Sequence, residues 1–500
     1  MEPKIIEHWI NGSLQSSSSD RFGDIFNPAS GEVISKLPMG NKSDLEKAVV
    51  AAEAAYLSWS KTSITKRAQV MFKFKELLES HREELTELIT LEHGKVLIDA
   101  AGSLQRGIEV VDFACGIPHL LKGEFSEQVG TGVDCYSVRQ PIGICSGVTP
   151  FNFPAMVPMW MFPIAIVCGN SFILKPSEKD PSCSMKLAEL MQQAGLPDGV
   201  LNVVHGDKEI VDAILEHPSI KTFSFVGSTP VAQYVHTKAS ENGKRVQALG
   251  GAKNHAIVLA DADIEQTANA IIGAAYGSAG ERCMAISVVV AIESVADSLR
   301  DKLLDKAKAL KIGPGQNSEN DMGPLITAEH KAKVMDYIQQ GQDADADLLL
   351  DGRDHPITSE SKGFFLGPTL FDHVKSDMSI YLDEIFGPVL VMLRVKDFSE
   401  AMELANQHQF GNGVALFTSK GSAAREFVSS VQVGMVGINV AIPVPLSFYS
   451  FGGWKDSIYG ASNIYGMDGV RFYTRTKTVT TRWPDMDEDQ DINLAMPTVD

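Results

Sequence analysis

The chain has 500 residues, of which 44% are hydrophobic and 21% are charged. This composition excludes a disordered polymer, a collagen-like repeat and a disulfide-stapled miniprotein, and the length exceeds what one hydrophobic core normally supports. The formal net charge of −19 argues against nucleic acid or an anionic membrane surface as a partner. From the length, we expect two large domains.

The cysteines and the N-terminus indicate the compartment. Six cysteines are present without a CxxC pair or a Cys/His ligand spacing, so we expect a reducing compartment and no metal site. The first thirteen residues contain acids and no apolar signal core, which predicts a cytoplasmic location. Residues 140–174 lack charge, but five prolines interrupt them, so we expect a buried helix and strand and no membrane span.

The N-terminal part is predicted to change from strands to helices. Residues 5–37 resemble short strands and turns. Apolar residues at helical spacing then predict a helix from Arg67 to Leu91, with Gly94 as its stop, and a second helical run from Asp99 to Leu121. Residues 128–139 alternate weakly, which indicates an extended strand pair.

The rest of the chain alternates between strands and helices. Predicted strands cover 171–174, 200–204, 222–226, 256–259, 287–292 and 388–392, with helices at 183–194, 210–215, after Pro230 and at 299–309. Strands joined by helices imply an α/β fold with two doubly wound parallel-sheet domains. The second unit begins near Gly251, residues 473–482 resemble an edge strand, and an acidic tail follows.

Two segments are candidates for a nucleotide site. The strand that runs into Gly227-Ser228-Thr229-Pro230 and a helix offers free backbone N–H groups to a pyrophosphate, although the full GxGxxG fingerprint is absent. Lys175 and Glu178 follow a strand, where α/β sheets bind ligands, and a carboxylate there favours NAD over NADP. The alternative is that both are solvated loop charges.

Cys283 is the candidate nucleophile. It follows Gly277 and Gly280 on a tight polar connection, and the adjacent Arg282 could stabilise a thiolate that adds to an aldehyde carbon. Asn152, in Thr149–Pro154, could donate to the resulting oxyanion together with the Cys283 N–H. The alternative for Asn152 is that it caps the following helix.

These motifs, with Leu249-Gly250-Gly251 and Glu384-Ile-Phe-Gly-Pro388, resemble the aldehyde dehydrogenase superfamily in order and over nearly the whole length. The segments 113–123 and 280–284 are similar to its CoA-acylating methylmalonate-semialdehyde/malonate-semialdehyde subfamily. The resemblance implies an NAD-binding domain at 1–123 and 143–250, a catalytic domain at 251–440, and a small β oligomerisation arm at 124–142 and 471–488, before a tail at 489–500. A homotetramer is also implied.

The resemblance also assigns roles. Cys283 would be the nucleophile and Asn152 the oxyanion donor, and the NAD site would contain Thr149, Phe151, Lys175, Glu178, Lys179, Ser228, Gly250 and Glu384. Hydrolytic members have a Glu where this chain has Ala248, and loss of that base handicaps water more than a thiol such as CoA. The implied reaction is NAD-dependent oxidation and decarboxylation of a semialdehyde with CoA as co-substrate, in inositol or valine breakdown.

Arg106 and Arg282 are the candidates for binding the substrate carboxylate, because arginine suits bidentate carboxylate recognition. The alternative is that each arginine forms a structural ion pair. A hydrolytic aldehyde dehydrogenase that uses Glu281 or Glu384 as base remains the main alternative for the reaction. A non-catalytic member of the fold is disfavoured, because the nucleophile and cofactor residues are kept.

Overall fold

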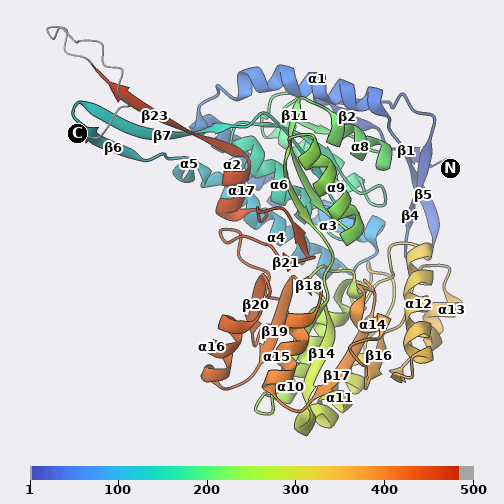
Figure 1. Cartoon of the computed structure of the whole chain (residues 1–500). Helices are drawn as coiled ribbons and strands as arrows, with labels where there is room; N and C mark the ends of the chain where they lie inside the picture. Colours follow the sequence, from blue (N-terminus) through green and yellow to red (C-terminus); the bar gives the residue numbers. More distant parts are fainter. Residues whose placement is uncertain (1–2, 484–500) are drawn as a thin grey trace.

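The computed structural model describes residues 3–483, which form two α/β domains and a projecting arm of strands (Figure 1). The first domain is the upper one in Figure 1, and the second is the lower one. The chain crosses to the second domain near Gly251 and returns at β22 (Ile458–Tyr459), which pairs with β12 (Arg245–Leu249).

The first domain has an eight-stranded sheet in the order β22-β12-β11-β8-β9-β10-β2-β3. Its parallel centre consists of β12, β11 (Ile220–Val226), β8 (Ile144–Val148), β9 (Ser171–Lys175) and β10 (Leu201–Val203), and antiparallel β2 (His8–Ile10) and β3 (Ser13–Gln15) extend one edge. The chain moves outward from β8 to β10 and then returns to the other side of β8. The gap between the ends of β8 and β11 is therefore a topological switch point, where α/β sheets bind ligands.

Helices cover this sheet on both faces: α1 (Lys42–Trp59), α2 (Ile64–Ser80), α3 (Arg82–His93), α4 (Leu97–Cys115), α5 (Ile117–Leu120), α6 (Met156–Val167), α7 (Ser182–Gln193), α8 (Lys208–Glu216), α9 (Thr229–Glu241) and α17 (Gly466–Phe472). The single helix predicted from Arg67 to Leu91 is wrong, because the chain leaves helical geometry at His81 (φ −107°, ψ 20°). The second predicted run is likewise divided at Gly116. Periodicity concealed both breaks because the successive helices bury their apolar faces in the same core.

The uncharged segment contains one more strand than predicted. All of α6 is buried and leads to β9, as expected, but β8 precedes them at the centre of the sheet. The sequence concealed β8 because it is short and contains Gly147, where a Cβ would come within 2.8 Å of the Phe172 ring. Within residues 3–483, no helix is long and apolar enough to cross a membrane.

The second domain has a seven-stranded sheet in the order β15-β16-β17-β14-β13-β19-β20, parallel except at β15. The strands are β13 (Asn254–Val258), β14 (Ile286–Ile292), β15 (Asp347–Leu350), β16 (Thr369–Asp372), β17 (Val389–Val395), β19 (Gly413–Phe417) and β20 (Met435–Ile438). The helices are α10 (Ile264–Tyr276), α11 (Glu293–Lys308), α12 (Ala328–Asp343), α13 (Pro356–Glu360), α14 (Ser379–Leu382), α15 (Phe398–Gln407) and α16 (Gly421–Ser430). A separate apolar core fills this domain.

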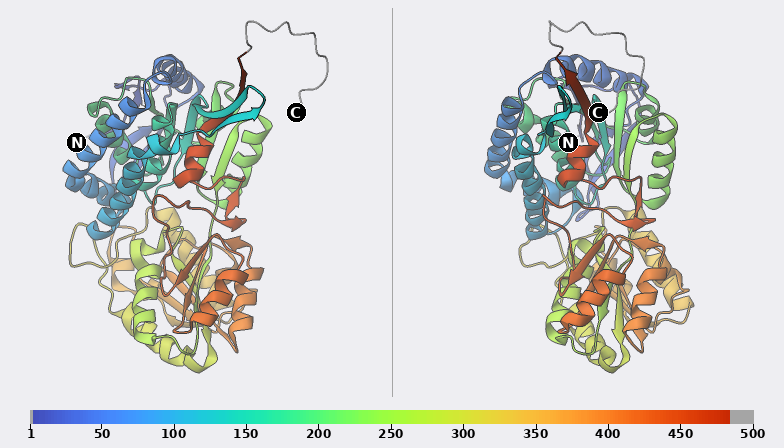
Figure 2. Two further views of the ribbon diagram at one scale, coloured as in Figure 1. Left: turned by 90° about the vertical axis from the view of Figure 1, so that its left-hand side faces the viewer. Right: turned by 60° about the vertical axis from the view of Figure 1, so that its left-hand side comes forward.

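The arm is a three-stranded antiparallel sheet in the order β23-β7-β6. The strand β23 (Thr474–Arg482) pairs with β7 (Val133–Pro141) from Thr474↔Pro141 to Arg482↔Val133, and β6 (Phe125–Gly130) lies on the other side of β7. Figure 2 shows this sheet projecting from the first domain. Residues 484–488 of the predicted arm and the predicted tail lie outside the described residues.

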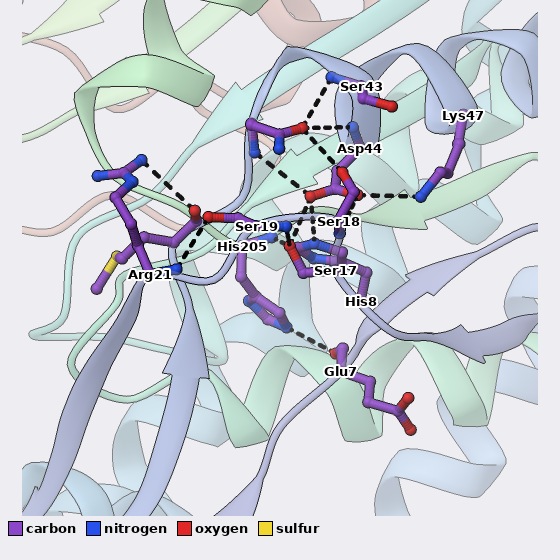
Figure 3. Close-up of polar contacts among 12 residues, drawn as sticks. Glu7, His8, Ser17, Ser18, Ser19, Arg21, Ser43, Asp44, Lys47 and His205 are labelled. Atoms are coloured by element: carbon purple, nitrogen blue, oxygen red, sulfur yellow. Dashed lines mark hydrogen bonds and ion pairs between the residues drawn. The ribbon is translucent and has the colours of Figure 1, made fainter.

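The N-terminal segment is held on α1 by a polar cluster (Figure 3). The buried Asp44 carboxylate accepts hydrogen bonds from the Ser17 hydroxyl (2.6 Å) and from the Ser18 N–H (3.0 Å), and it lies 3.4 Å from His8 Nε2. Burial alone would raise the Asp44 pKa, but these hydrogen bonds outweigh it and hold the pKa well below its usual range. Two further small sheets complete the fold. One has the strand order β1 (Lys4–Ile5), β5 (Glu32–Pro38) and β4 (Phe22–Asn27), and the other pairs β18 (Phe410–Gly411) with β21 (Trp454–Lys455).

Candidate active site

The loop after β8 places Asn152 at the switch point of the first sheet. The Thr149 N–H donates to the Lys175 carbonyl (3.1 Å), which joins the ends of β8 and β9. Asn152 follows and is 3% exposed. The helix-cap alternative for Asn152 is wrong, because α6 begins at Met156 and its N-cap is Ala155, with no side-chain cap.

Cys283 is presented by a strained turn between α10 and β14. Ser278 and Ala279 have φ values of 53° and 52°, in the left-handed region that costs non-glycine residues energy. Gly280 continues the turn at φ 76°, and a Cβ there would lie 2.2 Å from the Gly387 carbonyl oxygen. The Cys283 carbonyl accepts from the side-chain amide of Asn254 (2.9 Å), which fixes the residue just before β14.

Cys283 lines a small cavity of about 20 Å³ and two larger ones, and it therefore stands where the two larger cavities meet. The larger, of about 370 Å³, is lined by Asp99, Gly102, Ser103, Arg106, Phe153, Met156, Trp160, Arg282, Cys283, Met284, Ile442, Val444 and Phe451. The second, of about 260 Å³, is lined by Pro150, Phe151, Asn152, Val226, Gly227, Ser228, Gly250, Cys283, His330, Lys333, Glu384 and Phe386. We call them the arginine cavity and the glycine cavity.

Burial is the main influence on the pKa of the Cys283 thiol. Burial raises its pKa to about 12, and the Glu384 carboxylate adds to the rise, while the neighbouring Arg282 lowers it by less. Arg282 thus acts in the expected direction, toward the thiolate, but its effect on the pKa is smaller than that of burial. Burial also raises the Glu384 pKa to about 7, so this carboxyl can hold or release a proton near neutral pH.

The glycine cavity fits a dinucleotide. Ser228 is the N-cap of α9 and makes no side-chain cap, so the N–H groups of the first turn are available to an anion. The backbone must come close here: a Cβ on Gly250 would lie 2.9 Å from the Asp456 carbonyl, and one on Gly251 would lie 2.6 Å from Glu384 Oε2. Glu384 Oε1 accepts from the Ala252 N–H (2.9 Å), which orients this carboxylate, an acceptor for ribose hydroxyls.

The structure brings only part of the predicted cofactor set to this cavity. Phe151, Ser228, Gly250 and Glu384 line it, whereas Thr149, Lys175, Glu178 and Lys179 are not among its lining residues. The last three follow β9, the strand next to β8.

Lys175 and Glu178 form an ion pair (Nζ to Oε2, 3.0 Å). Burial raises the Glu178 pKa, but Lys175, a backbone hydrogen bond and Lys179 together outweigh it and leave the pKa below its ordinary value. Lys175 is 4% exposed, so the solvated-charge alternative is wrong for it.

Both candidate substrate arginines line the arginine cavity, and both also have carboxylate partners. Arg282 Nη2 lies 2.5 Å from Asp99 Oδ1, and Arg106 Nη1 lies 2.6 Å from Glu109 Oε2. Arg106 also donates to the Pro445 carbonyl. Each guanidinium keeps further N–H donors, because an arginine has five, so ion pairing and substrate binding are compatible here.

Of the two candidate bases for water, Glu281 is poorly placed. Glu281 is completely buried, its Oε1 accepts from the Ile326 N–H (3.1 Å), and burial raises its pKa well above the ordinary value. It is not among the residues that line either cavity. Ala248 is completely buried within β12 and carries no titratable group. Glu384, in contrast, lines the glycine cavity together with Cys283.

Several site residues were not predicted. His330 and Lys333 come from α12 in the second domain, and Trp160 comes from a helix that is buried throughout. No local pattern distinguishes them, because the neighbours that define their role are far away in sequence. Asp99 is the exception, since a carboxylate opposite Arg282 could have been sought among the helical residues. Within residues 3–483, no group of three or more His, Cys, Asp or Glu side chains could hold a metal.

Comparison with known proteins agrees with this geometry. Residues 14–479 match the model of the aldehyde dehydrogenase family, and the chain belongs to that family. It is 53% identical to a malonate-semialdehyde dehydrogenase of Pseudomonas aeruginosa over 99% of both chains, and 49% identical to one of Bacillus pumilus over 96% of this chain and 99% of the relative.

Two solved structures have nearly the same fold. A protein of Sinorhizobium meliloti, solved with NAD under the provisional name methylmalonate-semialdehyde dehydrogenase, has a TM-score of 0.96 and 52% identity over 97% of this chain and 99% of its own. The methylmalonate-semialdehyde dehydrogenase of Oceanimonas doudoroffii has a TM-score of 0.95 and 53% identity over 96% and 99%.

Proposed function

We propose that this chain is an NAD-dependent, CoA-acylating dehydrogenase that converts malonate semialdehyde or methylmalonate semialdehyde to acetyl-CoA or propionyl-CoA with loss of carbon dioxide. The observation that carries the proposal is the position of Cys283 between a cavity that fits a dinucleotide and a cavity lined by Arg106 and Arg282. The names of relatives at 49–53% identity support the same substrate class.

The first half of the reaction uses Cys283 and Asn152. The deprotonated sulfur adds to the aldehyde carbon, and the Asn152 side chain and the Cys283 N–H donate to the oxyanion. Bound NAD supplies the hydride acceptor. Ser228, Gly250 and Glu384 would hold it, with Phe151 against it, and Thr149, Lys175, Glu178 and Lys179 would contribute beyond this cavity.

The second half releases the product. After hydride loss the substrate is a thioester on Cys283 with a carboxylate on the adjacent carbon, so loss of carbon dioxide leaves an enolate that takes up a proton. The CoA thiol then attacks the thioester carbonyl, and the Cys283 sulfur leaves as thiolate. A thiol is the favoured acceptor because Ala248 offers no base, Glu281 is buried away from the cavities, and Glu384 would be engaged by the ribose hydroxyls of NAD.

We extend the proposal to assembly and setting. The chain would form a homotetramer through the arm of β6, β7 and β23 and act in the cytoplasm. The pathway would be inositol or valine breakdown. The ratio of kcat/KM for malonate semialdehyde and methylmalonate semialdehyde would distinguish the two. Mass measurement of the purified protein tests the tetramer directly.

One assay tests the reaction. Malonate semialdehyde, NAD and CoA are supplied together, and NADH, carbon dioxide and acetyl-CoA are followed in parallel. We expect all three in equal amounts, no NADH from Cys283→Ala, and normal turnover from the control Cys135→Ala, which lies in the arm. NADH from Cys283→Ala would refute the nucleophile, and free acid formed without CoA would favour the hydrolytic alternative.

A further inference from the structure

Lys95 is a buried cation beside the oxyanion donor. It is 1% exposed, and its Nζ donates to the main-chain carbonyl of Asn152 (2.6 Å) and lies 4.4 Å from the centre of the Phe153 ring. Burial lowers its pKa to about 8, with Asp99 opposing the shift and Arg282 adding to it. Burying a lysine costs free energy, so its retention here calls for a specific contact.

The loop that carries Asn152 has few anchors of its own. It lies between the end of β8 and the start of α6, outside regular structure, and Pro150 and Pro154 have no N–H to donate. Two side chains donate to its carbonyls: Lys95 to Asn152 and, at 3.3 Å, the Ser184 hydroxyl to Pro154. The contact to Asn152 is the shorter one and involves the charged donor, which makes it the stronger of the two.

Lys95 is itself fixed from both domains. Gly94 ends α3 at φ 92°, with its N–H on the Thr90 carbonyl (2.9 Å), and this sets the direction of the chain at Lys95. From the second domain, the loop with Gly315 and Gly323 packs on this turn, where an added Cβ would lie 2.3 Å from the Lys95 carbonyl and 2.2 Å from the Gly94 carbonyl, respectively. The Lys95 main chain therefore has little freedom.

We propose that Lys95 is a positioning residue that holds the main chain of Asn152, and so aims the Asn152 amide at the substrate oxyanion, without touching substrate itself. This inference rests on the proposed function only in taking Asn152 as the oxyanion donor. A displacement of about 1 Å in a catalytic group can cost about 100-fold in rate. The effect should therefore fall on the steps in which an oxyanion forms, and acylation is the one of these that NADH formation reports.

The test measures the pre-steady-state burst of NADH at saturating NAD and semialdehyde. Lys95→Met should lower the burst rate by about 100-fold, and Lys95→Arg should recover part of it. The matched control is Lys244→Met, because Lys244 is also a buried lysine that donates to main-chain carbonyls, those of His217 and Ile220, away from both cavities. Its burst rate should stay at the wild-type value.

Two further measurements separate positioning from general damage. Alkylation of Cys283 by iodoacetamide forms no oxyanion, so its rate should be unchanged in Lys95→Met. The double variant Lys95→Met/Asn152→Ala should be no slower than Asn152→Ala alone, because both changes remove one function.

The proposal would be overturned if the Cys283 alkylation rate in Lys95→Met fell as much as the burst rate. It would also be overturned if the losses of the two single variants added in the double variant. If Lys95→Met does not fold, Lys95→Gln carries the same comparisons. The single variant Cys283→Ala tests the proposed function independently: loss of the NADH burst supports that function, and a retained burst refutes it.

Discussion

Replacing Arg282 with methionine should distinguish aldehydes that carry a carboxylate from those that do not. The guanidinium lines the arginine cavity beside Cys283, and its side chain is 18% exposed. A hydrogen bond to a charged group in such a place contributes about 1.5–3 kcal/mol. Since 1.4 kcal/mol is a factor of ten, kcat/KM for malonate semialdehyde should fall by about 10- to 150-fold.

The Asp99 carboxylate complicates a single substitution. Arg282→Met leaves Asp99 in the cavity without its partner at 2.5 Å, where it would repel the substrate carboxylate. The double variant Asp99→Asn/Arg282→Met removes that repulsion, so the difference between the two variants measures it. Arg282→Lys keeps the charge without the planar fork and should give an intermediate loss.

The assay compares malonate semialdehyde with propanal, which has the same three-carbon chain and no carboxylate. NADH formation at low substrate gives kcat/KM for each. We expect the loss for malonate semialdehyde to exceed that for propanal by at least the factor above. Equal losses for both aldehydes would show that Arg282 only supports the fold, through its ion pair with Asp99.

Two further predictions follow from the nucleophile's surroundings. The Glu384 carboxylate raises the Cys283 pKa, so Glu384→Gln should lower that pKa. Alkylation of Cys283 by iodoacetamide should then be faster than in the wild type above pH 7, where Glu384 is ionised. An unchanged or slower alkylation rate would contradict the assigned cause. Gly280→Ala should destabilise the protein by about 1–3 kcal/mol, because the new Cβ would meet the Gly387 carbonyl and the residue has a positive φ. Gly273→Ala in α10 should instead stabilise the protein by about 0.5–1 kcal/mol, because a Cβ there would lie in open space. Equal melting temperatures for the two variants would refute this account.

Much of the fold was readable from local patterns. The strands at 171–174, 200–204 and 222–226 correspond to β9, β10 and β11, because short β-branched runs between helical segments persist whatever surrounds them. β8 escaped notice although it lies at the centre of the sheet. Its five residues include Ser146 and Gly147, which are not typical strand formers. Only the packed structure shows that Phe172 and Met161 leave no room for a side chain at Gly147.

The sequence by itself determined the type of fold and the candidates for the reactive groups. The glycines before Cys283 and the prolines around Asn152 mark irregular chain at both residues, and such marks are local. The acidic composition and the absence of metal-ligand spacings also needed no structure.

Only the tertiary structure decided how those groups meet and how burial shifts their pKa values. It joined Asn152, Cys283 and Glu384 at one cavity, gave Arg282 a partner in Asp99, and buried Lys95 against the loop that carries Asn152. Distances between residues more than a hundred positions apart, and the desolvation that raises the Cys283 pKa to about 12, are properties of the packed chain. No local pattern encodes them, because each depends on which distant segments exclude water from the same space.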